Sequence, residues 1–157
     1  MVMRYMFDLG LIEFNLAQCS SSLKCAAVMY LIRRLLRLYC QCLGEEQWSC
    51  SYRNLPPWTD SLTRLTGHKE TTVLRNVAFI YGLLLIESQF FLNESSPGLM
   101  TGCGSPFRVS IISKKLPPVF LFKAAFKKFS RETCLSVATH PMLRCFTSSD
   151  IADLNQH

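Results

Sequence analysis

The residues most able to do chemistry in this chain are its eight cysteines and three histidines. No Cys-x-x-Cys pair occurs, and the nearest approach to one is Cys40-x-Cys42. The histidines fall at no metal-ligand spacing relative to one another or to the cysteines; they are His68, His140 and His157. The pattern therefore predicts no metal site, and it favours reduced thiols in a protein of the nucleus and cytoplasm.

Catalytic sets of other kinds are also missing from the sequence. A cysteine nucleophile needs a base and an electropositive site, and no spacing pairs one cysteine with one histidine. Gly102-Cys103-Gly104 lacks the following lysine and helix that hold a phosphate group. No spacing marks an acid–base pair among the acids of the predicted helices, which are Asp8, Glu13, Glu70 and Glu87. We therefore expect a non-catalytic protein with no cofactor and no catalytic or metal-binding residues.

Length and composition indicate one packed domain. The chain has 157 residues, of which 49% are hydrophobic and 18% charged, values that suit a folded core. Its net charge of +6 is spread along the chain, with two local clusters of basic residues. These clusters are Arg33-Arg34 with Arg37, and Lys123 with Lys127, Lys128 and Arg131. Because each falls on one face of a predicted helix, a solvated face is favoured and no nucleic-acid partner is expected.

Apolar residues at helical spacing predict the elements that must position any site. The first helix is expected over residues 3–14, with Asp8 and Glu13 open to solvent and a buried side made of Met6, Leu9, Ile12 and Phe14. Ser22 is expected to cap a second helix over residues 23–38. We expect this second helix to be the central one, because the small Ala26 and Ala27 let a neighbouring backbone come close.

A short helix is expected between Pro57 and Gly67, with a buried face made of Trp58, Leu62 and Leu65. Thr66 is expected to cap the next helix, which runs to about Glu87. The buried stripe of that next helix is expected to be Val73, Leu74, Val77, Ile80, Tyr81, Leu84 and Leu85. A last long helix is expected over residues 120–129, with Phe122, Ala125, Phe126 and Phe129 on its apolar side.

Two stretches without a persistent period interrupt this pattern, at residues 39–56 and 88–119. They are either genuine loops or residues introduced by an imperfect gene model. A tail follows His140, with Ser148 or Ser149 as the cap of a final turn through Leu154. The one candidate for membrane attachment is residues 77–92, but Glu87 and Gln89 interrupt it and it falls short of the ~20 residues that span a bilayer. We therefore expect no membrane partner.

Four stretches in chain order resemble the second cyclin box of the A- and B-type mitotic cyclins. The run from Asp8 to Leu16 is similar to the family's acid-Leu-x-x-Leu-acid-aromatic-acid opening, and Cys25-Ala26-Ala27-Val28 is similar to its alanine-rich second helix. Trp58 to Gly67 resembles the family's Trp-Thr-x-x-Leu-x-x-x-Thr-Gly. Ala124 to Ser130 resembles the Ala-Val-x-x-Lys-Tyr-Ser of its last helix. One departure is Ser20-Ser21, which stands where the family has a pair of prolines.

The resemblance implies an all-α fold, a five-helix cyclin-box-like bundle with long irregular insertions. It implies a single cyclin C-terminal domain over residues 1–157, with a helical core at about 3–87 and 120–155. The function it implies is that of a non-catalytic regulatory protein of the cell cycle, whose full-length relatives bind and activate cyclin-dependent serine/threonine kinases. The family's first box, which carries most of the kinase contact, has no counterpart here, so we expect a truncated cyclin that binds a kinase poorly by itself.

Two alternatives from other classes stay open at this point. The lysines around 123–131 would suit a small basic helical protein that binds nucleic acid or acts as a scaffold. Residues 77–92 would suit a protein anchored at a membrane surface, which predicts sedimentation with lipid vesicles.

Overall fold

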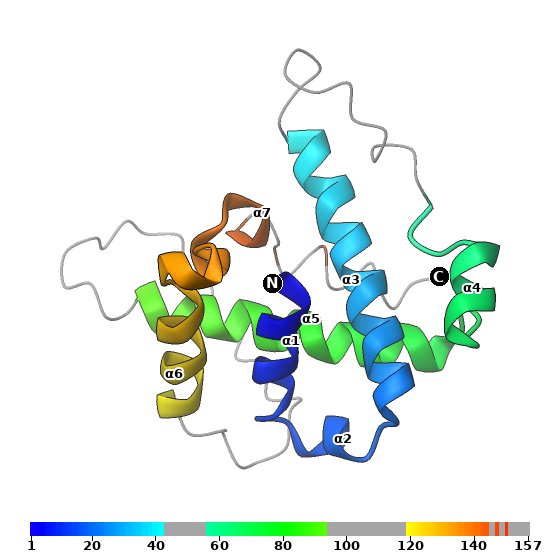
Figure 1. The fold of residues 1–157 in the computed structure, drawn as a ribbon, viewed down its shortest axis with the longest axis horizontal. Coiled ribbons are helices and arrows are strands. Elements are labelled where there is room, and N and C mark those ends of the chain that lie inside the picture. The colour runs from blue at the N-terminus through cyan, green and yellow to red at the C-terminus, as the bar shows by residue number, and fades with distance from the viewer. Residues whose placement is uncertain (43–55, 94–118, 145–146, 148–149, 151–157) are drawn as a thin grey trace.

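The computed structural model describes residues 1–42, 56–93, 119–144, 147 and 150, and over these ranges the fold is all-α, without a strand (Figure 1). The predicted all-α fold class is thus confirmed over the described residues. The longer helices are α1 (Val2–Gly10), α3 (Ser21–Cys42), α4 (Asp60–Thr66), α5 (Thr72–Asn93) and α6 (Val119–Phe129). The shorter elements are α2 (Phe14–Ala17), the 3-10 helices η1 (Glu132–Cys134) and η2 (Val137–Thr139), and α7 (Pro141–Arg144).

Helix α5 is the base on which the other long helices pack. It contacts α1, α3 and α6, which cross it along its length, while α4 lies at one of its ends beside the start of α3 (Figure 1). Helix α3 in turn contacts α1, α4 and α7, so the centre of the molecule is shared between α3 and α5. Ala26, Leu31, Trp58 and Val77 are all buried in one hydrophobic core, as the apolar stripes predict.

The first helix ends earlier than the sequence suggests. Helix α1 stops at Gly10, which lies directly on α5: a Cβ atom at this position would stand 2.6 Å from the ring of Tyr81. The chain then turns, and Glu13 caps the short helix α2 by accepting a hydrogen bond from the backbone N–H of Asn15 at 3.1 Å. The predicted helix through Phe14 is therefore wrong, as are an exposed Glu13 and a buried Phe14. Glu13 is 5% exposed and Phe14 is 73% exposed.

Helix α3 begins one residue before the predicted cap. Ser20 is the cap, since its hydroxyl accepts a hydrogen bond from the N–H of Leu23 at 3.2 Å, and Ser22 lies inside the first turn. The helix continues to Cys42, four residues beyond the predicted end at Leu38. The buried side of the helix agrees with the apolar stripe, and it includes Ala26, Ala27, Tyr30, Leu31 and Leu35.

The short helix α4 is set by its caps and by Trp58. Thr59 caps its start through the N–H of Leu62, and Gly67 ends it with a φ of 73°, in the left-handed region that favours glycine. Trp58 precedes the helix and is buried, and its indole N–H donates to the carbonyl of His68 at 3.0 Å. Because the helix begins only at Asp60, Leu65 points away from Trp58. It is 78% exposed, which corrects its predicted burial.

Helix α5 is capped by Thr71 instead of Thr66. The Thr71 hydroxyl accepts from the N–H of Leu74, whereas Thr66 closes α4 by donating to the carbonyl of Leu62. Val73 in its first turn is 59% exposed, so its predicted burial is wrong: Leu74 in the same turn is fully buried, and Val73 lies on the solvent side of the helix. The rest of the predicted stripe is buried or partly buried. The helix ends at Asn93, six residues beyond the predicted end at Glu87.

The C-terminal part agrees with the apolar pattern for residues 120–129. Phe122, Ala125 and Phe129 of α6 are buried and Phe126 packs partly against the core. The structure adds η1 and η2 between α6 and His140, where the sequence predicts no element, and α7 at the start of the predicted tail. Most of the two predicted insertions, at 43–55 and 94–118, and the expected caps Ser148 and Ser149 lie outside the described residues.

The contact between Gly10 and Tyr81 yields a prediction about stability. Gly10→Ala should lower the free energy of unfolding by about 1–3 kcal/mol, because a methyl group has no room against the Tyr81 ring. Chemical denaturation of the two proteins measures this difference. Gln18→Ala, an exposed change nearby, is the control and should change stability by less than about 0.5 kcal/mol. A Gly10→Ala protein as stable as the parent would show that α1 does not lie this close to α5.

Candidate functional site

The side chains that usually carry out catalysis or hold metals are dispersed in the structure. No group of three His, Cys, Asp or Glu residues within the described ranges could hold a metal ion. Cys19, Cys25 and Cys134 carry free thiols. His140 is exposed, and its Nδ1 accepts a hydrogen bond from the N–H of Met142 at 3.2 Å, a contact that holds the start of α7.

One serine and one histidine do lie together. The hydroxyl of Ser22 is 2.9 Å from Nε2 of His68, and it also lies 3.4 Å from the carbonyl of Thr66. A serine nucleophile also needs a group that orients the histidine and donors for an oxyanion. In the part of the chain that the structure describes, Nδ1 of His68 has no such acceptor. The contact joins the first turn of α3 to the turn between α4 and α5.

Two acids that the sequence places on separate helices come within electrostatic reach of each other. Burial raises the pKa of Glu87 above its ordinary value of 4.5, and the negative charge of Glu13 raises it further. The carboxylate of Glu13 is already hydrogen-bonded to Asn15. Its Oε1 accepts from the backbone N–H of Asn15 and from the side-chain amide of Asn15, the latter at 2.8 Å. Sequence reasoning missed this pair, because it depends on the turn after Gly10 bringing α2 against α5.

The feature best suited to binding is a groove between α1 and α6. The two helices run antiparallel: the rings of Tyr5 and Phe129 are 5.3 Å apart, and the ammonium of Lys128 is 2.6 Å from a carboxylate oxygen of Asp8. Alongside this contact lies a cavity of about 290 Å³. It is lined by Asp8, Leu11, Ile12, Leu121, Ala124, Ala125 and Lys128.

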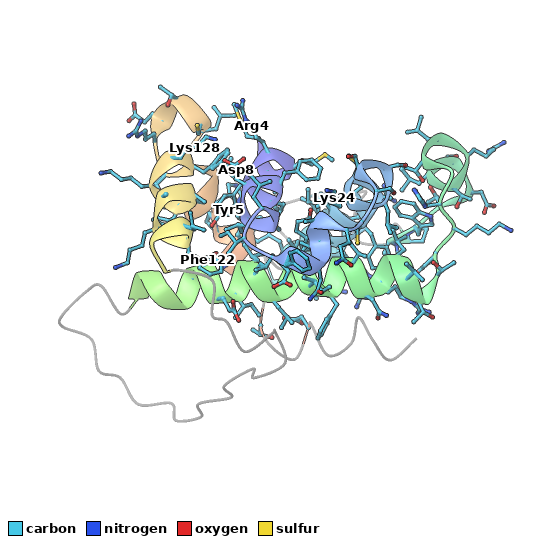
Figure 2. All side chains as sticks on the ribbon, turned by 90° about the horizontal axis from the view of Figure 1, so that it is seen from below. Arg4, Tyr5, Asp8, Lys24, Phe122 and Lys128 are labelled. Carbon is cyan, nitrogen blue, oxygen red and sulfur yellow. The ribbon has the colours of Figure 1, made fainter. Side chains whose placement is uncertain are left out.

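The groove has an apolar end and a charged end. Leu11, at 85% exposed, and Leu121, at 37%, leave large aliphatic surfaces open to solvent at the apolar end. Figure 2 shows Arg4, Asp8 and Lys128 together at the other end, away from α5. Arg4 and Asp8 are one helical turn apart and so share a face of α1. An arrangement of this kind can bind one or two apolar side chains beside a charged rim.

No pattern in the sequence indicates this groove. Leu11 belongs to no apolar stripe, and the expected face of residues 3–14 assumes a helix that continues past Gly10. The sequence predicts Lys128 on a solvated face. In the structure its side chain is 46% exposed, and its ammonium pairs with Asp8 and lies 5.0 Å from the centroid of the Phe129 ring. Of the other basic cluster, Arg33 donates to the carbonyls of Pro56 and Pro57, so it holds the entry to α4.

Comparison of the chain with family models, with curated proteins and with solved structures gave no match. Over the described ranges, no helix is long and apolar enough to cross a membrane. What the site can do therefore has to be argued from its own geometry and from the resemblance of the sequence.

The pKa of Glu87 predicts how stability depends on pH. In the folded protein this carboxyl gives up its proton at a higher pH than in the unfolded chain, so ionisation costs stability as the pH rises through and above 4.5. Glu87→Gln should remove this cost: the variant should be more stable than the parent at neutral pH, and the difference should vanish at a pH well below 4.5. Thermal unfolding between about pH 3.5 and pH 7.5 measures it.

The matched control for this experiment is Glu132→Gln, which removes the charge of an exposed acid on η1 and so measures the effect of losing a surface carboxylate. A Glu87→Gln variant that is less stable than the parent at neutral pH would contradict the assignment. That result would mean that the carboxylate of Glu87 makes a favourable interaction in the folded protein.

Proposed function

We propose that this protein is a cyclin-type regulatory protein of the cell cycle, a non-catalytic partner of a cyclin-dependent serine/threonine kinase. The proposal rests on the order of four stretches that resemble the second cyclin box. Its main structural support is that the helices carrying these stretches, α1, α3, α4 and α6, pack with α5 around one hydrophobic core. Segments that belong together in a family motif are expected to share a core, and here they do.

The most informative of these stretches is the one around Trp58. In this chain its residues have definite structural roles: the indole of Trp58 packs 6.2 Å from the ring of Tyr30 and hydrogen-bonds to His68, Thr59 caps α4, and Gly67 ends it. A buried tryptophan, a capping threonine and a left-handed glycine, in that order along the chain, therefore hold α4 against α3. The same residue types at the same spacing in the cyclins would do the same work.

A regulator of this kind acts by binding one conformation of the kinase more tightly than another. The active state gains population only to the extent of that difference in affinity. In the mitotic cyclins that the chain resembles, the first box makes most of the kinase contact. We therefore assign to this domain a supporting part of the regulator, in which it acts as a rigid partner of a kinase-binding box.

The decisive experiment is a chimera in which this chain replaces the second box of a mitotic cyclin. If the domain is of the cyclin type, the chimera should bind and activate the cognate kinase, whereas the chain alone should bind it weakly and should not activate it. Kinase activity on a histone substrate and calorimetric binding measure the two effects. A chimera carrying an unrelated helical domain of similar size is the control. A folded chimera that activates no better than this control would refute the proposal.

A basic helical protein that binds nucleic acid is the second candidate, and one observation favours it. Lys123 and Lys127 are exposed on α6 beside Lys128, and Arg131 follows the helix. Binding through these side chains would weaken steeply with salt, since it would release counterions from the phosphates. A titration with DNA and RNA at several salt concentrations separates this candidate from the first. Scaffold activity would show neither nucleic-acid binding nor kinase activation.

A further inference from the structure

We propose that the groove between α1 and α6 binds an acidic peptide segment of a partner protein. In this complex one apolar side chain of the peptide packs against Leu11 and Leu121, and carboxylates of the peptide lie beside Arg4 and Lys128. This binding site goes beyond kinase regulation and does not depend on it, because the groove is lined by Asp8 of α1, by the turn that follows α1 and by α6.

The apolar end of the groove has the size and exposure that a peptide anchor needs. Leu11 and Leu121 line it, with Ala124 between the helices offering no side chain to fill the space. The cavity of about 290 Å³ is at or below the lower limit for sites of drug-sized molecules, so it suits a side chain rather than a cofactor. Phe14, 73% exposed and three residues after Leu11, extends the exposed apolar surface along the chain.

Charge decides which peptides fit. Asp8 is the acid that faces the groove, and its carboxylate is already bonded to Lys128 at 2.6 Å. Arg4 lies one turn from Asp8 on the same face of α1, and Figure 2 shows it near Asp8 and Lys128, so two cations stand beside one carboxylate. The rim is therefore positive, and it complements an acidic segment and repels a basic one.

The geometry also sets the spacing in the peptide. Arg4 and Leu11 are seven residues apart on and just after α1, which corresponds to about 10 Å along a helix. An extended peptide covers that distance in about three residues. The matching segment therefore has a leucine or phenylalanine about three residues from a pair of acids. Nucleic acid supplies the negative charge but no apolar side chain for the Leu11 end, so the groove favours a peptide.

Fluorescence anisotropy of a labelled, synthetic peptide with the full chain tests the proposal. The probe is about ten residues long and carries Phe-Leu and, about three residues later, Glu-Glu. The companion probes replace Glu-Glu by Lys-Lys, or Phe-Leu by Ala-Ala. The acidic apolar probe should bind at least tenfold more tightly than either companion, and its affinity should fall with added salt.

Variants of the chain locate the binding. Leu11→Ser should weaken binding of the acidic apolar probe about tenfold or more, because the anchor loses its apolar wall. Leu65→Ser removes an equally large and similarly exposed leucine from α4 and should leave binding unchanged. Ala124→Glu should weaken binding strongly by placing a carboxylate in the groove. Lys123→Ala, which lowers the net charge by the same single unit elsewhere on α6, should have an effect of less than about twofold.

Several outcomes would overturn the proposal. One is failure of the parent chain to bind the acidic apolar probe; another is equal loss in Leu11→Ser and Leu65→Ser. Sedimentation that shows a dimer of the parent chain, abolished by Leu11→Ser, would mean that a second copy of the chain occupies the groove. Binding of RNA or DNA that competes with the probe and is insensitive to Leu11→Ser would assign the rim to nucleic acid. Circular dichroism confirms that each variant is folded.

Discussion

The close approach of α1 to α5 is the constraint on which the rest of the structure depends. Gly10 lies so near the ring of Tyr81 that no side chain fits between the two helices. Helix α1 ends at Gly10, and the chain turns before Glu13 caps α2. The same approach places the hydroxyls of Tyr5 and Ser88 3.2 Å apart, and the Ser88 hydroxyl donates to the carbonyl of Leu85. A buried chain of hydrogen bonds therefore connects α1 and α5. With α1 fixed in this way, α6 packs beside it and the groove forms between them.

Polar contacts fix how the elements meet but contribute only part of the stability. Tyr30 of α3 donates to Glu70 at 3.0 Å, and the indole of Trp58 donates to the carbonyl of His68, so hydrogen bonds of partly buried groups join the turn between α4 and α5 to α3 and to the residue that precedes α4. Burial of Tyr5 and Tyr30 raises the pKa of each, so both stay neutral over the physiological range. The ion pair of Asp8 and Lys128 is open to solvent and is worth about 0–1 kcal/mol. Its value lies in orienting α6 and in leaving Arg4 with no acid of its own.

The sequence contained enough to predict the helices and most of the core, because apolar spacing reports which face of each helix is buried. The buried positions of α3, α5 and α6 agree with that spacing at residues such as Leu31, Tyr81 and Phe122. It predicted the ends of α4 and α6, at Gly67 and Phe129, but not those of α1, α3 and α5. Leu65 and Val73 are exposed although they were included in the predicted apolar faces, because apolar type alone does not show which residues at the edge of a face meet the core. The groove could not be predicted from the sequence either. Its walls come from α1 and α6, and the pairing of these helices depends on a glycine contact with a third helix.

A packing module of this kind obtains its function from surface that the core leaves unused. Every large apolar residue of α6 except Leu121 that the structure describes faces the core, and Leu121 faces the groove instead. Leu11 is more exposed than any other large apolar residue described in the chain, although it directly follows the most tightly packed residue of α1. Exposed apolar residues cost solubility, and they are common where a partner covers them. Leu11 stands in the turn that directly follows the contact at Gly10, so the contact that holds α1 on α5 also sets where Leu11 meets solvent. The binding surface is thus a direct consequence of how the core is closed.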